Sequence, residues 1–135
     1  MEDTRNIEKI YSKEELASED GDFFRKRITK WKQERIEKGY CQYDLWSFDN
    51  FLLAMIPAAL HEFADTTTSY PGRTVEGISE NMEQWRAFIH KIANDFTEGA
   101  EQLEDIGTVG QPEEGMRKID KAWTRLGEWL YDLWD

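Results

Sequence analysis

Few residues in this chain of 135 have the types and spacing that chemistry requires. The two histidines, His61 and His90, are candidates for metal binding or proton transfer, and Asp65 follows His61 at helical spacing. A di-metal helical bundle takes Glu-x-x-His from two helices, whereas alanine stands three residues before each histidine here. We therefore interpret both histidines as ordinary surface or boundary residues, and we predict no metal site.

Nucleophilic and hydrolytic chemistry has no stronger candidates. The single cysteine, Cys41, lies in a predicted turn and has no histidine nearby in the sequence. The sequence contains no Gly-x-Ser-x-Gly, Walker or His-Glu-x-x-His motif. A metal-dependent hydrolase built on scattered acids stays an alternative, with its site at one of two carboxylate pairs. These pairs are Asp44/Asp49 and Asp65/Asp95. We predict no catalytic residue and no cofactor.

A segment before the longest uncharged run combines acids with an indole. Asp44 can accept hydrogen bonds at a helix N-terminus, where the helix dipole favours negative charge. Trp46 can anchor the first turn, and Asp49 follows Asp44 closely. These three residues predict either a helix cap with its anchor or part of a binding surface.

An anion could be held by the basic helix expected at 25–38 or by Arg73, with Trp46 or Tyr70 stacking on a base. This combination makes the binding or sequestering of a small molecule, such as a nucleotide, an alternative function. The simpler interpretation is a solvated helix face that neutralises acidic neighbours.

The net charge of −11 argues against general affinity for nucleic acid, because phosphates would be repelled. Many of the acids gather around one predicted turn and could cover a basic surface on a partner protein, where complementary charge speeds and orients the encounter. Solubility is the simpler reason for such a surface. The acids are Glu98, Glu101, Glu104, Asp105, Glu113 and Glu114.

Composition indicates a soluble globular protein, because 39% of the residues are hydrophobic and 33% are charged. No uncharged run approaches the ~20 residues that a membrane-spanning helix needs. The N-terminus lacks the apolar stretch of a secretory signal, so we expect a cytoplasmic protein. The aromatic content of 13% exceeds what four short helices obviously hide, which leaves self-association open.

These candidates must be positioned by helices, because helical periodicity dominates the chain. It predicts an all-α fold, a compact four-helix bundle in a single domain at 20–135, after a partly ordered N-terminal extension at 1–19. The four helices are expected at about 22–38, from 44 or 47 to about 65, at 79–104, and from 112 onward.

Local signals mark the ends and the shape of these helices. Ser12 and Glu15 form a potential capping box, and Gly39 is placed to end the first helix. The second helix is apolar on two sides, which predicts a central position, and Pro57 is expected to bend it. Ser79 is the candidate N-cap of the third helix.

The third and fourth helices each carry an apolar seam with the three-four alternation of bundle helices. The seam of the third helix is predicted at Met82, Trp85, Ile89, Ile92, Phe96 and Leu103. The seam of the fourth helix is predicted at Met116, Ile119, Trp123, Leu126, Leu130 and Leu133.

The order of these motifs resembles a group of small uncharacterised proteins encoded by bacteriophages and prophages. The resemblance covers about residues 39–135 apart from the loops, and neither the N-terminal extension nor the acidic turn at 98–111 belongs to it. The matching residues are Gly39, Tyr40, Asp44, Trp46, Asp49, Pro57, Thr67, Tyr70, Pro71, Trp85, Ile89, Ile92, Phe96 and the segment 131–134.

The resemblance implies a host-cell cytoplasmic location and no established activity. Our leading hypothesis is a non-enzymatic phage accessory protein that binds and modulates a host or phage protein. Inhibition of a defence nuclease through the acidic surface is one form of it.

Overall fold

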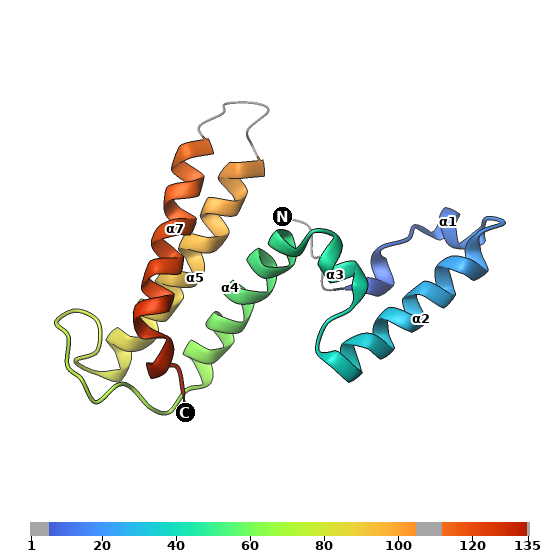
Figure 1. The fold of residues 1–135 in the computed structure, drawn as a ribbon. Helices are drawn as coiled ribbons and strands as arrows, with labels where there is room; N and C mark the ends of the chain where they lie inside the picture. The colour runs from blue at the N-terminus through green and yellow to red at the C-terminus, as the bar shows by residue number, and fades with distance from the viewer. Residues whose placement is uncertain (1–5, 105–111, 135) are drawn as a thin grey trace. The chain divides into compact units, whose positions relative to one another are not determined.

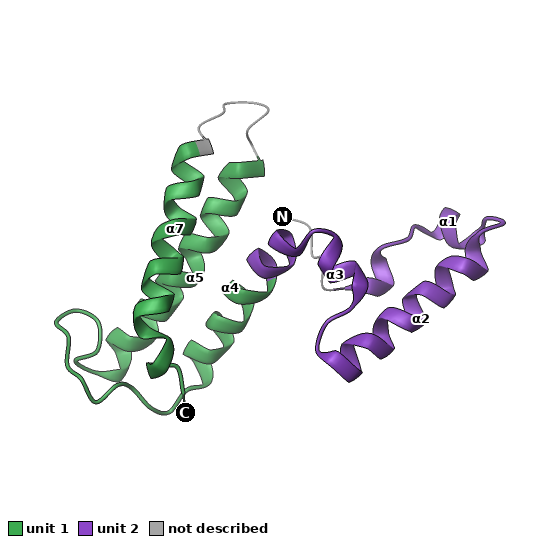
Figure 2. Ribbon diagram, in the orientation of Figure 1, with its two compact units in different colours: residues 1, 55–135 green, residues 2–54 purple. Residues whose placement is uncertain are grey.

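The structure is a computed structural model that describes residues 6–104 and 112–134 (Figure 1). All regular secondary structure in these ranges is helical, which confirms the all-α fold class. The described residues divide into two compact units, up to Ala54 (unit 2) and from Met55 onward (unit 1), as Figure 2 shows. The boundary between the two units, after Ala54, differs from the predicted boundary between an N-terminal extension at 1–19 and a single domain at 20–135. That domain organisation stays a prediction.

Unit 2 contains η1 (Ile7–Lys9), α1 (Lys13–Ala17), α2 (Gly21–Lys38), α3 (Gln42–Trp46) and the beginning of α4 (Phe48–Thr66). The capping box at the start of α1 is confirmed. The Glu15 backbone N–H donates to Ser12 Oγ at 3.0 Å, and the Ser12 N–H donates to Glu15 Oε1 at 3.0 Å. Gly39 ends α2 as expected, because its left-handed φ of 85° allows its N–H to donate to the Arg35 carbonyl at 2.9 Å.

The core of unit 2 forms around Trp31, which is 1% exposed. Ile7 and Cys41 are buried with it, and Tyr11 and Tyr43 pack against the cluster. Two of these core residues, Ile7 and Tyr11, fall in the predicted N-terminal extension. The extension therefore supplies core side chains to this unit.

α4 begins directly after Ser47, one of the two predicted starts, and residues 42–46 form the separate short helix α3. The fully buried residues of α4 are Pro57, Leu60 and Ala64. The other apolar side chains of α4 are partly or largely exposed, so its burial on two sides is not confirmed. The bend at Pro57 and the four-helix bundle are likewise not confirmed and stay predictions.

α5 (Met82–Glu104) begins three residues later than predicted. Its first turn is capped by Asn81, whose side-chain oxygen accepts from the Gln84 backbone N–H at 2.9 Å. The predicted cap, Ser79, is instead buried in the preceding loop. Its hydroxyl donates to the Arg73 carbonyl at 2.7 Å and accepts from the Val75 N–H at 2.9 Å.

Unit 1 is built on a hairpin of α5 and α7 (Pro112–Trp129), and a short η2 (Leu130–Asp132) follows α7. This is the most extensive helix pairing among the described residues, and Figure 1 shows the two helices side by side. A Cβ on Gly99 would lie 2.7 Å from the Gly115 carbonyl oxygen, and one on Gly115 would lie 2.8 Å from the Gly99 oxygen. The two backbones therefore touch at this point, which only glycine permits.

The predicted seam of α5 is confirmed at its centre, because Trp85, Ile89, Ile92 and Phe96 are fully buried. The partly buried ends of this seam are Met82 and Leu103. Burial extends beyond the seam to Ala93.

The predicted seam of α7 is confirmed only in part, because Ile119 and Leu126 are partly buried and the Ile119 side chain lies at the contact with Gly99. Met116, Trp123 and Leu130 are 54%, 41% and 54% exposed. The residues just before them, Gly115, Ala122 and Trp129, are the buried ones. Large side chains of α7 also contact α5, because the Trp129 ring lies 5.4 Å from that of Trp85 and the Trp123 ring lies 5.0 Å from that of Phe96. Trp123 is only partly covered by this contact.

Candidate binding surfaces

Asp44, a predicted binding residue, forms a buried ion pair within unit 2. Its Oδ2 accepts from Arg35 Nε at 3.1 Å and from the Cys41 backbone N–H at 2.8 Å, and its Oδ1 lies 2.5 Å from Arg35 Nη2. Burial by itself would raise the pKa of the Asp44 carboxyl, but the hydrogen bonds from Arg35 and Cys41 outweigh burial and lower this pKa. Asp44 thus ties α2 to the start of α3, and its oxygens are occupied.

The other two residues of that segment are on the surface. Trp46 is 50% exposed and packs edge-on against Trp31 at 5.4 Å between ring centroids. The guanidinium of Arg27 lies 5.0 Å from the Trp46 ring and 5.0 Å from the Phe23 ring. Asp49 is exposed in the first turn of α4. The exposed rings and the cation between them make a surface that stacking ligands or partner side chains could contact.

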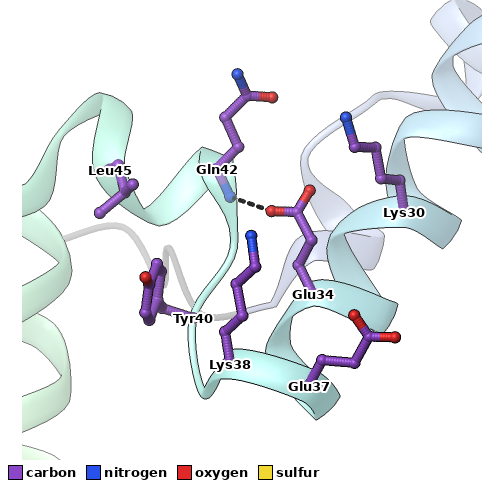
Figure 3. Close-up of a pocket in the computed structure, with 7 residues that line it drawn as sticks. All are labelled: Lys30, Glu34, Glu37, Lys38, Tyr40, Gln42 and Leu45. Carbon is purple, nitrogen blue, oxygen red and sulfur yellow. Dashed lines mark hydrogen bonds between the residues drawn. The ribbon is translucent and has the colours of Figure 1, made fainter.

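A pocket of 420 Å³ opens between the end of α2 and the start of α3 (Figure 3). Its size lies within the ~300–1,000 Å³ of small-molecule sites. Two basic side chains of the predicted anion-binding helix, Lys30 and Lys38, line it beside Tyr40. Glu34 and Glu37 line it as well, and Glu34 Oε2 accepts from the Gln42 backbone N–H at 3.1 Å. The two carboxylates balance the two ammonium groups, so a phosphate gains little net attraction there.

Arg73 and Tyr70, the second predicted anion site, lie in the loop before α5. Tyr70 is 49% exposed. The Arg73 guanidinium lies 3.6 Å from the centre of the Trp129 ring, and its Nη2 donates to the Glu128 carbonyl at 3.1 Å and to Asp132 Oδ2 at 2.9 Å. This guanidinium therefore holds the loop against the C-terminal end of α7 and already has an anionic partner.

The two histidines, interpreted from the sequence as ordinary residues, meet in unit 1. His61 of α4 and His90 of α5 approach with 2.6 Å between their Nδ1 atoms, and His90 Nε2 lies 2.9 Å from Asp65 Oδ1. The ring centroids are 4.9 Å apart. This separation is the sum of the Nδ1–Nδ1 distance and the two distances from each ring centroid to its own Nδ1 atom. The rings therefore meet edge to edge along the line of a hydrogen bond.

The positions of the protons in these contacts follow from which atoms can donate and which can accept. The Asp65 carboxylate accepts, so His90 Nε2 carries a proton, and a single further proton lies between the two Nδ1 atoms. The result is a chain of two hydrogen bonds, from Asp65 to His90 and from His90 to His61, that joins α4 to α5. The sequence signal was present but weak, because the i, i+4 spacing of His61 and Asp65 does not reveal where His90 lies.

The predicted acidic surface forms at one end of the α5–α7 hairpin. The Gly99–Gly115 contact brings the last turns of α5 next to the first turn of α7, so the acids of both helices lie at the same end. Glu98 is 55% exposed in its side chain and pairs with Lys118 at 3.2 Å. The exposed acids at this end are Glu98, Glu101, Glu104, Glu113 and Glu114. The sixth predicted acid, Asp105, lies outside the described residues.

Three of the four carboxylates named for a hydrolase, Asp44, Asp65 and Asp95, each contact a basic side chain. Asp95 is buried and pairs with Lys91 at 3.4 Å and with Arg125 at 3.3 Å, whereas Asp65 contacts His90. Within residues 6–104 and 112–134, no group of three or more metal-binding side chains is placed to hold a metal ion. None of the helices in these ranges combines the length and the apolar character that a membrane crossing demands.

Comparison of the chain with protein-family models, with curated proteins and with solved structures finds no match.

Proposed function

We propose that this chain is a non-enzymatic protein-binding module whose contact surface is the acidic end of the α5–α7 hairpin. The observation that carries the proposal is the position of Glu101, an exposed acid in the last turn of α5. Negative charge opposes the helix dipole at a C-terminus, typically by about 0.3–1 kcal/mol. The helix dipole therefore does not favour Glu101 at this position, and a contact with a basic partner would account for it.

The hairpin adds to this charge from its second helix. Glu113 and Glu114 are exposed in the first turn of α7, where the dipole favours them. The backbone contact between Gly99 and Gly115 holds the two helices together, so the carboxylates of both helices lie on one surface. Such a surface complements a basic patch on a protein. A phage accessory protein that covers the basic surface of a host protein, for example a defence nuclease, is the form of this function that we propose.

The test is affinity capture from a bacterial lysate with two matched triple variants. Glu101→Gln, Glu104→Gln and Glu114→Gln neutralise the acidic end, and Glu76→Gln, Glu83→Gln and Glu128→Gln remove the same charge elsewhere. At about 50 mM salt, wild type and the control triple should retain a partner that the first triple loses, because surface charges act over roughly one Debye length. The partner should leave at about 500 mM salt, where screening is much shorter in range. Equal retention by both triples, or no salt-sensitive partner, would exclude this surface as the binding site.

The size of the pocket at the end of α2 and the ring of Tyr40 in its lining favour a second candidate function, the binding of a small molecule such as a nucleotide by stacking and not by net charge. Lys30 and Lys38 lie in the predicted basic helix, and Tyr40 provides a ring beside them. A nucleotide at about 100 times its dissociation constant should stabilise unit 2 by roughly 2.7 kcal/mol in thermal unfolding. A panel of nucleotides that leaves the unfolding temperature unchanged would eliminate this function and leave the first one standing.

A further inference from the structure

We propose that α7 packs against α7 of a second copy of this chain, as an antiparallel pair centred on Trp123. The surface concerned is the α7 stripe, which we define as Met116, Trp123 and Leu130. Met116 and Trp123 are seven residues apart and so lie on one side of α7, and Leu130 follows directly after α7 as the first residue of η2. All three are large, apolar and roughly half exposed. The proposal does not depend on the acidic surface.

A glycine on the same side of α7 gives a second, independent observation. Gly127 lies four residues after Trp123 and three before Leu130, which places it within the α7 stripe. Glycine inside a helix costs about 1 kcal/mol relative to alanine. Gly99 and Gly115 are explained by the close contact of α5 with α7. A Cβ on Gly127 would meet nothing within 4 Å among the described residues, so packing within the described chain does not require glycine there. The space beside Gly127 would admit the close approach of a helix from a second copy of the chain.

The apolar area available is suited to association. At about 200 Å² for a large side chain, the α7 stripe exposes about 300 Å². Tyr131 and Trp134, which are 90% and 66% exposed, add about 300 Å² directly after it. The total reaches the upper end of the ~300–600 Å² found for the largest patch on a monomer, and approaches the ~800 Å² per partner of a standard interface. Tryptophan at the centre of such a patch is a typical hot spot of binding energy.

The charges of α7 favour a second copy as the occupant. The chain as a whole carries −11, but the acids and bases of α7 cancel. A basic macromolecule would gain no net attraction along this helix, whereas two copies of α7 meet no net repulsion. The acids are Glu113, Glu114, Asp120 and Glu128, and the bases are Arg117, Lys118, Lys121 and Arg125.

The spacing of the α7 stripe selects the antiparallel orientation. Met116 and Leu130 are equally distant from Trp123, so a two-fold axis at Trp123 places Met116 opposite Leu130 of the partner subunit. The two acidic ends then point away from each other and remain accessible. A parallel pair would bring Glu113 and Glu114 next to the same acids of the second copy, and like charges would oppose it. The helical bundle expected within one chain would in this way be completed between two hairpins.

The decisive experiment measures the mass of the full chain by light scattering or sedimentation from about 1 µM to about 100 µM, which brackets micromolar dissociation constants. The mass should rise from that of the 16.0 kDa monomer toward twice this value. Gly127→Gln should weaken association at least tenfold. The same variant should raise the unfolding temperature in dilute solution, because glutamine is a better helix former than glycine and its Cβ has open space. Lys121→Gln, on the opposite side of α7, should associate like wild type.

The orientation of the two α7 helices is tested by disulfide crosslinking of introduced cysteines. The native Cys41 is buried and should not react. Met116→Cys alone should not form a disulfide between copies, whereas Met116→Cys combined with Leu130→Cys should. A chain that stays monomeric at about 100 µM would overturn the proposal, as would a Gly127→Gln variant that dimerises like wild type. Efficient crosslinking of the single Met116→Cys variant would overturn the antiparallel arrangement.

Discussion

Removal of the Asp44 carboxylate should loosen unit 2 more than any surface substitution in that unit. Asp44→Ala would leave the Arg35 guanidinium without its buried partner and the Cys41 N–H without its acceptor. Breaking one side of a buried ion pair costs about 3–5 kcal/mol. The Arg35 side chain is 23% exposed and can recover some hydration, so we expect about 2–3 kcal/mol.

The assay uses the single cysteine as a local reporter. Cys41 is fully buried, and burial raises the pKa of its thiol, so a thiol reagent should react with it only when unit 2 opens. A loss of about 2–3 kcal/mol corresponds to labelling roughly 30- to 150-fold faster at pH 7. Asp49→Ala is the matched control, because Asp49 is exposed, and it should change the rate less than about twofold. Replacement of both partners, as Arg35→Met with Asp44→Ala, should cost less than Asp44→Ala alone.

The same carboxylate predicts an acid-dependent stability. The folded-state pKa of Asp44 is lowered relative to an unfolded-chain value near 3.8, so its contribution is complete above that value and is lost as the pH falls through the folded pKa. In denaturant titrations, the difference between wild type and Asp44→Asn should be constant from about pH 5 to 8 and shrink below about pH 4. Two results would refute the reasoning. One is a loss of stability below about 1 kcal/mol for Asp44→Ala, and the other is a stability difference between wild type and Asp44→Asn that grows as the pH falls.

Two further predictions concern unit 1. Gly99→Ala should destabilise the α5–α7 hairpin by about 1–3 kcal/mol in circular-dichroism melts, because the added Cβ would lie 2.7 Å from a backbone oxygen, although alanine favours helices. The control, Gly127→Ala in dilute solution, should be neutral or stabilising. A Gly99→Ala variant as stable as wild type would contradict the backbone contact. A double-mutant cycle with His61→Ala and His90→Ala should give a coupling of about 0.5–1.5 kcal/mol for the bond between α4 and α5, whereas additive losses would show that this bond does not stabilise the fold.

Most of the helices could be predicted from the sequence, because the forces that form them act within a few residues. Apolar periodicity identified α2, the start of α4 after Ser47, and the buried centre of α5. Short-range hydrogen bonds at Ser12 and the left-handed backbone at Gly39 marked helix ends correctly. The cap of α5 was misplaced, because Ser79 is an equally good cap in sequence and its use in a buried loop turn depends on the Arg73 carbonyl.

Contacts between residues far apart in the sequence could not be predicted from these local signals. The predicted seam of α7 missed Gly115, Ala122 and Trp129, which are buried, because the close approach of α5 at Gly115 rotates the contact and glycine gives no hydrophobic signal. The bond between His61 and His90 joins residues 29 apart, and the ion pair of Arg35 with Asp44 crosses a turn. A pattern read along one helix shows which side of it is apolar. Which side packs depends on how near a second helix can come, and that distance is set by the shapes of both.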